Sequence, residues 1–325
     1  MENDFRIYRT FLPVLTSRAQ RHKKYSFPGN LIKPTPSRTM TAFLRASVPA
    51  AARLSTDELT FVLNQMLGLE LPERLLARGQ RAPCGVEVDR GGVHLLNCVR
   101  CAQVTKAHDL VQGWVRRQAR GAGLTVTVTG NSGFPAEMDP AGGVHRRPDI
   151  ALHHDAFNPI PGVRVPFYRD RLRGLALDVS LVSSAAVDDP RSPPRPRPYA
   201  LKRRHAEKMG KHGLWCSRQG WGFASLVVST AGVPHADSLR FLELLASQMV
   251  QAIGAQRAGM DVDNAGAVMG ASAPQMRGAV LGRLKAEFSL VEMKAGCMRA
   301  FEALWGGAGA AVPPKPPPQK PNRTK

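Results

Sequence analysis

Two aspartates stand inside otherwise apolar segments of this chain, and they are its side chains best suited to chemistry. Asp149 directly precedes the apolar run Ile150-Ala151-Leu152, and Asp178 lies in the middle of LALDVSLV. A charged side chain inside a strand costs several kcal/mol unless it is paired or coordinated. Two such carboxylates on neighbouring strands would repel each other unless a cation lay between them. The pair therefore predicts a site for Mg²⁺ (or Mn²⁺), because hard dications prefer carboxylate oxygens.

Lysines follow the second aspartate on a basic segment, 199–220, that has the composition of a helix. Lys208 and Lys211 are three residues apart and can share one face of that helix. Phosphodiester hydrolysis needs a divalent metal to neutralise the charge that builds on the phosphate oxygens. A nearby ammonium can orient the attacking water or stabilise that charge. Asp149, Asp178, Lys208 and Lys211 are therefore predicted to form a catalytic group.

The same residues also have purely structural explanations. Asp149 could pair with Arg146 or Arg147, which precede it in the sequence. Asp178 could cap a loop or meet Arg173, and the lysines could form a solvated helix face. Residue types and spacing leave both explanations open.

A cysteine/histidine segment, PCGVEVDRGGVHLLNCVRC, lies upstream of the aspartates. It contains Cys84, His94, Cys98 and Cys101, with a spacing that resembles three-quarters of a structural Zn²⁺ site. Arg81 stands where a Cys-x2-Cys partner would be, although Cys101 could supply the fourth thiolate. We expect either a zinc knuckle or a metal-free remnant that is folded by its glycines, with Cys98 and Cys101 in the core.

Composition limits the partners. The chain has 325 residues, 45 Lys+Arg against 25 Asp+Glu, and a formal charge of +20. Such an excess predicts attraction to a polyanion, most often nucleic acid, although a basic tail is the simpler explanation. No apolar run is long enough to span a bilayer, and the first residues do not form a secretory signal. Five cysteines, an odd number, favour reduced thiols and hence an intracellular chain without a membrane partner.

The elements that must position these residues follow from periodicity. Helical patterns cover 54–77, with Ser55 or Thr56 as the cap, and 102–123, which glycines close. Further helices are expected over 199–220, over 235–256 with Asp237 or Ser238 as the cap, and over 273–305. Strands are expected at 124–129, 148–154, 172–184 and 222–230. This order predicts an α/β sheet covered on both faces, with its chemistry at strand ends.

Six motifs, taken in order, resemble a known family. LSTDELTFVLNQMLGLELP, CGVEVDRGGVHLLNC with KAHDLV, RRPDIAL, LALDVSLV, AEKMGKHG and GWGFASLVVSTAGV are similar to blocks of one nuclease domain. It is the restriction-endonuclease-like domain found C-terminal to the reverse transcriptase of non-long-terminal-repeat retrotransposons. The resemblance covers roughly residues 54–250. It implies the PD-(D/E)xK fold, a mixed sheet flanked by helices and preceded by a partial knuckle. It also implies a Mg²⁺-dependent nick in target DNA, within the nucleus.

The resemblance also assigns residues. Asp149 matches the family's Pro-Asp carboxylate and Asp178 its second metal ligand. Lys208 matches the helical lysine, and Lys211 a second lysine one turn on. His108 and Asp109 match a His-Asn/Asp pair, which we place on the DNA-binding face together with Arg146, Arg147, Arg203 and Arg204.

Four residues depart from the family pattern in the site or the knuckle. Ala107 stands where the family has Arg, Arg81 where it has the first zinc cysteine, and Thr129 where it has a Glu. Glu137 could replace that Glu from a loop, and His212 stands where the family usually has Tyr. The chain also lacks the polymerase's paired-aspartate motif.

The expected organisation has five parts. They are a basic arm at 1–53, a helix and degenerate knuckle at 54–101, an endonuclease-like domain at 102–256 with a Pro/Arg-rich insert at 188–198, a helical extension at 257–305 and a Pro/Lys tail at 306–325. We expect a metal-dependent DNA endonuclease whose basic helices follow phosphates. A binding module without cleavage on the same fold is the alternative, and a chain that docks to protein or RNA through its Pro-rich segments is a third.

Overall fold

A computed structural model describes residues 53–67, 70–76, 80–82, 84–97, 104–128, 148–153, 173–183, 198–258 and 273–305. These residues form a mixed α/β structure. Its elements in chain order are α3 (Thr56–Leu67), α4 (Val93–Asn97), α5 (Val104–Gly121), β1 (Val126–Val128), β2 (Ile150–His153), β3 (Gly174–Val182), α6 (Pro198–Lys208), the π-helical turn η3 (Met209–Gly213), α7 (Leu214–Arg218), β4 (Trp221–Ser229), α8 (Ala236–Ala258) and α10 (Ala273–Trp305).

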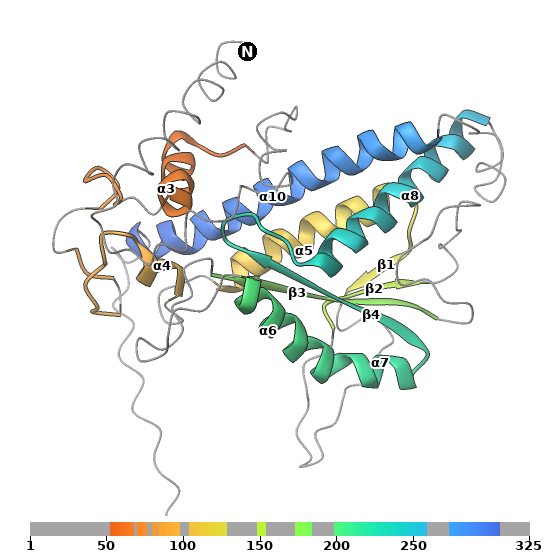
Figure 1. The fold of residues 1–325 in the computed structure, drawn as a ribbon, viewed down its shortest axis with the longest axis horizontal. Helices are drawn as coiled ribbons and strands as arrows, with labels where there is room; N and C mark the ends of the chain where they lie inside the picture. The colour runs from red at the N-terminus through yellow and green to blue at the C-terminus, as the bar shows by residue number, and fades with distance from the viewer. Residues whose placement is uncertain are drawn as a thin grey trace, which may run out of the picture.

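The sheet has four strands in the order β1-β2-β3-β4, and each lies within a segment that the sequence predicts. β1, β2 and β3 are antiparallel neighbours, whereas β4 runs parallel to β3. A parallel neighbour needs a crossover connection, and α6, η3 and α7 lie on that connection (Figure 1). The sheet is therefore mixed, as expected.

Alternation along β3 assigns its side chains to two faces. Leu175, Leu177 and Val179 belong to the main core, while Ala176 packs in a separate cluster with Cys216 of α7. Figure 1 shows α6 and α7 on one side of the sheet and α5, α8 and α10 on the other. The expectation of a sheet covered on both faces is thus confirmed. Asp178 alternates with Leu177 and Val179, so it lies on the side of α6.

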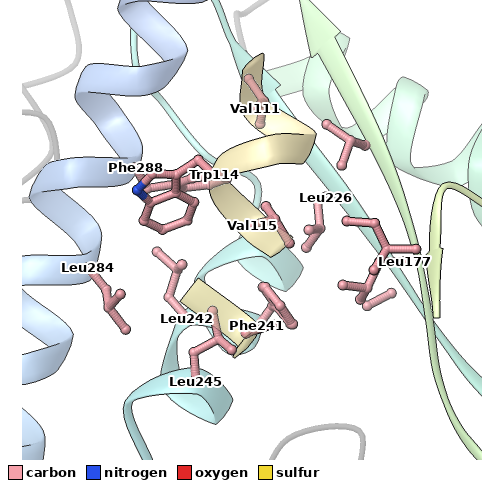
Figure 2. Packing of buried hydrophobic residues seen from close by; sticks show 14 of the residues in the cluster. Val111, Trp114, Val115, Leu177, Leu226, Phe241, Leu242, Leu245, Leu284 and Phe288 are labelled. Carbon is pink, nitrogen blue, oxygen red and sulfur yellow. The ribbon is translucent and has the colours of Figure 1, made fainter. Parts of the chain in front are cut away.

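The main core fills the space between the sheet and the three long helices. Trp114 of α5 packs against Phe288 of α10 with ring centroids 5.0 Å apart. Figure 2 shows Leu177 and Leu226 of the sheet facing Val115, while α8 contributes Phe241, Leu242 and Leu245. Burial of these side chains, each contributing about 1.5–3 kcal/mol, fixes α5 against the strands. α5 carries residues of the candidate site, so this packing also positions that site.

A second cluster joins the N-terminal segment to the other end of α10. Phe61 of α3 meets Phe301 of α10 with ring centroids 5.5 Å apart, and Leu95 and Leu96 of α4 are buried in the same cluster. Figure 1 shows α3 and α4 beside this end of α10. α10 therefore connects the knuckle region to the sheet.

Two helix starts show how well capping can be read from sequence. Ser55 caps α3 as predicted. The Glu58 amide donates to Ser55 Oγ, and the Ser55 amide donates to the Glu58 carboxylate. The predicted cap of α8, Asp237 or Ser238, is wrong. The helix begins one residue before Asp237, and the ring Nδ1 of His235 accepts the Asp237 amide. The Ser238 hydroxyl donates to the β4 backbone instead.

Length alone does not make α8 or α10 a membrane helix. Neither these two, with 23 and 33 residues, nor any other helix in the described ranges combines the length and apolarity that crossing a bilayer requires.

Candidate active site

Asp178 is the buried centre of the candidate site. Its side chain belongs to β3 and is only 3% exposed as a residue. Lys208 Nζ donates to Asp178 Oδ2 at 2.7 Å, and His212 Nε2 lies 3.6 Å from Oδ1. The Ser180 hydroxyl is 3.5 Å from Oδ2. Within the described residues, the ion-pair partners of Asp178 are therefore Lys208 and His212 and not Arg173.

The junction of α6 and η3 decides which basic residues reach this carboxylate. Lys208 is the last residue of α6, and the chain then widens into the π-helical turn. His212, four residues after Lys208, is fully buried beside Asp178, whereas Lys211 is exposed. π-helical turns change the angular spacing of successive side chains and often mark functional sites. Lys208 and His212, instead of Lys208 and Lys211, therefore face Asp178.

Asp149 lies one residue before β2 and is held by groups on two elements. Its Oδ2 accepts the Val179 amide of β3 at 2.7 Å and lies 3.0 Å from His108 Nε2 of α5. Its own amide donates to the Leu177 carbonyl at 2.8 Å. Gln112, one turn after His108, donates to the Asp149 carbonyl at 3.3 Å. The carboxylate that the sequence singles out is thus fixed beside the residue that follows Asp178.

The two carboxylates interact electrostatically. Burial raises the pKa of Asp178, and the charge of Asp149 raises it further, while Lys208 and His212 oppose both effects. The hydrogen bond to Asp149 raises the pKa of His108, although burial partly offsets it. The site therefore contains two acids and three basic groups, and each acid contacts at least one base.

Ser225 extends the polar row across the sheet. It is the register partner of Asp178 on β4 and is completely buried. Within the described residues its hydroxyl has no hydrogen-bond partner. An unsatisfied buried hydroxyl is rare and calls for an explanation, such as an unseen water or ion.

The other residues predicted for DNA binding lie on exposed helix surfaces or outside the described ranges. Asp109 is 3.5 Å from His108 Nδ1 and exposed. Arg203 and Arg204 are exposed on α6 and both pair with Glu207. Several predicted positions lie outside the described residues: Arg146, Arg147, Thr129, Glu137 and the insert at 188–198, apart from Pro198.

Half of the predicted knuckle can be described. Cys84 Sγ lies 3.1 Å from His94 Nε2, so two of the four predicted zinc ligands are neighbours. His94 is presented by α4, whose first amides are capped by both carboxylate oxygens of Asp89. Cys98 and Cys101 lie outside the described residues.

Sequence reasoning missed three polar residues of this site. Gln112 could have been found from its i, i+4 spacing to His108. Ser225 could have been found from alternation, because it lies between Phe223 and Val227 on the face opposite Ala224 and Leu226. His212 carries no local signal, since its position depends on the π-helical turn.

No protein-family model matches the chain, and no curated protein is significantly similar to it.

Proposed function

We propose that the chain is a metal-dependent DNA endonuclease of the restriction-endonuclease-like class, which nicks target DNA by hydrolysing a phosphodiester bond. Asp149 and Asp178 are the metal ligands, and Lys208 acts beside the reacting phosphate. The observation that carries this proposal is the buried pair of Asp178 with the helix ammonium of Lys208, whose Nζ is 2.7 Å from Asp178 Oδ2. A second carboxylate, Asp149, binds the amide of the next residue, Val179, and interacts electrostatically with Asp178.

The donor set fits a hard dication. Carboxylate oxygens are the ligands that Mg²⁺ and Mn²⁺ prefer. The charge of Asp149 disfavours ionisation of Asp178, and a dication between them would remove that repulsion. The ion would supply Lewis-acid stabilisation of the charge that builds on the phosphate oxygens.

The protein's own basic groups have separate tasks. Lys208 neutralises a phosphate oxygen once the metal binds the carboxylates. His108 orients Asp149 through the 3.0 Å contact, and its raised pKa favours the charged, donating form. Arg203 and Arg204, exposed on the same helix as Lys208, bind the DNA backbone. RNA is a second possible polyanion, and a nuclear location fits a DNA target.

The first test replaces one ligand. Asp149→Asn should lower Mg²⁺-dependent nicking of supercoiled plasmid by at least about a hundredfold, because even indirect changes at metal sites cost 10–100-fold. Binding of the same DNA, measured by gel shift, should be unchanged. Asp57→Asn, at an exposed acid of α3, is the control for loss of one negative charge. Equal nicking by wild type and Asp149→Asn would contradict the proposal.

A nucleic-acid-binding module without cleavage is the alternative, and one observation favours it. Both carboxylates already contact basic side chains, Asp149 with His108 and Asp178 with Lys208. A site neutralised in this way can persist without a metal. Calorimetry that detects no Mg²⁺ binding, together with salt-sensitive DNA binding and no nicking in Mg²⁺ or Mn²⁺, would establish this alternative.

For the upstream segment we propose a structural Zn²⁺ held by Cys84, His94, Cys98 and Cys101. The 3.1 Å approach of the Cys84 thiol to His94 supports it. Structural zinc sites commonly combine thiolates and imidazoles in this way.

A further inference from the structure

A second group of side chains that can bind metals lies where α6 meets the start of α8. His205 is three residues before Lys208, His235 immediately precedes α8, and Asp237 is in the first turn of α8. One potential ligand atom from each residue lies within 4.8 Å of the others. The group contains two imidazoles and one carboxylate, and none of them belongs to the carboxylate site described above.

Backbone and side-chain contacts hold this group in place. The His235 amide and the Ser238 hydroxyl both donate to the Val227 carbonyl of β4, which fixes the start of α8 on the sheet. His205 Nε2 lies 3.3 Å from Asp237 Oδ2. The His205 and His235 rings stack with centroids 4.1 Å apart and planes 19° from parallel. Asp237 is 9% exposed, so the carboxylate is largely removed from water.

The two oxygens of Asp237 have different surroundings. Oδ1 accepts a bond from Arg240 at 2.9 Å, whereas Oδ2 faces His205. The Arg240 side chain is 62% exposed, so its charge is screened by solvent. Oδ2 is therefore the oxygen available to the histidine pair.

A simple ion pair accounts for only part of this arrangement. It explains the contact of His205 with Asp237 but not the second imidazole stacked against the first. Two protonated rings at 4.1 Å would repel each other, and Lys202 and Arg240 add further positive charge. In addition, the buried His205 Nδ1 has no hydrogen-bond partner in the described part of the chain.

We propose that His205, His235 and Asp237 form a site for a transition-metal dication of the Zn²⁺ class, separate from the Mg²⁺ site. Imidazoles suit Zn²⁺ and its neighbours, whereas Mg²⁺ prefers oxygen ligands. Two imidazoles and one carboxylate leave a fourth position of a tetrahedral ion for water. In the structure His235 Nδ1 accepts the Asp237 amide at 3.2 Å. Use of Nδ1 by the metal replaces this hydrogen bond, whereas use of Nε2 requires the ring proton to move to Nδ1.

The position of the site gives the metal a structural role. It links α6, which carries Lys208, to the start of α8, and α8 is packed into the main core. Because the metal binds only the folded arrangement, its binding should raise the thermal midpoint of the protein.

The test measures Zn²⁺ binding to the metal-free full chain by competition with a chromophoric chelator. It uses a Cys84→Ser/Cys98→Ser/Cys101→Ser background, which removes the thiolates of the proposed knuckle. His235→Gln and Asp237→Asn should each weaken binding by more than about a hundredfold, since loss of a direct ligand exceeds the 10–100-fold cost of outer contacts. His153→Gln is the matched control, because His153 lies on β2 with Thr127 and Trp221 as its neighbours. Circular dichroism of the metal-free variants verifies folding.

A second measurement needs no variant of the site. X-ray absorption of the Zn²⁺-loaded Cys84→Ser/Cys98→Ser/Cys101→Ser protein should show imidazole and oxygen ligands without sulfur. Sulfur ligation, or equal Zn²⁺ affinity of the His235→Gln and His153→Gln proteins, would overturn the proposal. The readouts are binding and spectroscopy, so absence of nuclease activity would not affect the result.

Discussion

Lys208 has a proposed role in catalysis and a separate role in folding. It neutralises the buried Asp178 carboxylate whether or not the protein cleaves DNA. Its ammonium is 2.7 Å from Asp178, and the two side chains are 17% and 4% exposed. Removal of one member of a buried pair leaves an uncompensated charge, which costs about 3–5 kcal/mol. Because water still reaches the lysine, we expect its removal to lower the free energy of unfolding by about 3 kcal/mol or less.

We therefore predict that Lys208→Met destabilises the protein strongly at neutral pH, whereas Lys211→Met changes stability by no more than about 0.5 kcal/mol. Urea unfolding of both variants measures the difference. Addition of Asp178→Asn to Lys208→Met should recover part of the loss, since it removes the unpaired charge. A similar small effect of both lysine variants would show that the 2.7 Å contact contributes little to folding.

Glu292 provides a pH-dependent prediction outside the site. It is completely buried in α10, and within the described residues neither carboxyl oxygen has a hydrogen-bond partner. Burial raises the pKa of Glu292 well above its usual range. The folded protein therefore keeps this proton at pH values where the unfolded chain has lost it. The stability that the protonated Glu292 contributes is fully present below the unfolded pKa of about 4.3. This stability is lost as the pH rises toward the folded pKa.

Glu292→Gln cannot ionise, so its free energy of unfolding relative to wild type should increase with pH. The expected slope is up to about 1.4 kcal/mol per pH unit in the interval that begins above the unfolded pKa and ends at the raised folded pKa. Urea unfolding at several pH values within this interval gives the slope. A difference between the two proteins that stays constant with pH would mean that Glu292 does not keep its proton in the folded state.

The residues of the site were partly predictable. Asp149 and Asp178 stand out because a carboxylate in an apolar run is costly, and Lys208 follows from the basic helix. The contact of His108 with Asp149 spans 41 positions and is set by the packing of α5, so no local pattern predicts it from residue types alone. The same holds for His205, His235 and Asp237, which come together only when α6 lies beside the start of α8.

At the level of elements, the sequence predicted which segments form helices and strands better than it predicted how the strands pair. The four strands lie within the predicted segments because β-branched and apolar runs are local signals. The antiparallel and parallel pairings depend on long-range packing, and the π-helical turn has no reliable sequence signature. The α8 cap was assigned wrongly because Asp237 forms ion pairs with His205 and Arg240 instead of binding the helix amides.

The contact of α10 with the end of β4 can be tested with two glycines of the same helix. A Cβ at Gly296 would lie 2.9 Å from both the Cβ and the carbonyl oxygen of Thr230, whereas one at Gly282 would meet nothing within 4 Å. Gly296→Ala should therefore destabilise the protein by about 1–3 kcal/mol through overpacking. Gly282→Ala should stabilise it by up to about 1 kcal/mol, because alanine is the better helix former.

Thermal unfolding of the two alanine variants gives shifts that should have opposite signs. The pair controls for helix propensity, because both substitutions are the same and both positions lie in α10. Stabilisation by both would indicate that α10 can move away from β4 at little cost.

At the level of the whole molecule, net charge is the property most directly tied to a partner. A charge of +20 exceeds what folding requires and creates a field that attracts polyanions. The described part of the chain contributes exposed basic residues on α5 and on α6, the two helices that also carry His108 and Lys208. Exposed basic residues and the candidate site thus occur on the same elements, and the proposed nuclease function requires such a surface to hold its substrate.

Arg203 and Arg204 allow this link to be measured. Both pair with Glu207 on the solvent side of α6, with side chains 57% and 45% exposed. Exposed pairs of this kind contribute about 0–1 kcal/mol, so a phosphate can displace the glutamate at small cost. If the chain makes 6–10 phosphate contacts, DNA affinity should fall by about a thousandfold or more between about 50 and 200 mM salt.

The double variant Arg203→Gln/Arg204→Gln should lower the slope of log affinity against log salt by about one for each lost phosphate contact, uniformly across DNA sequences. Arg74→Gln, in the turn that follows α3, is the control, because Arg74 is equally exposed but far along the chain from the candidate site. Glu207→Gln should have the opposite effect and strengthen binding at low salt, since it removes one negative charge beside both arginines. An unchanged slope in the double variant would assign the electrostatic attraction to other basic residues and remove α6 from the proposed DNA surface.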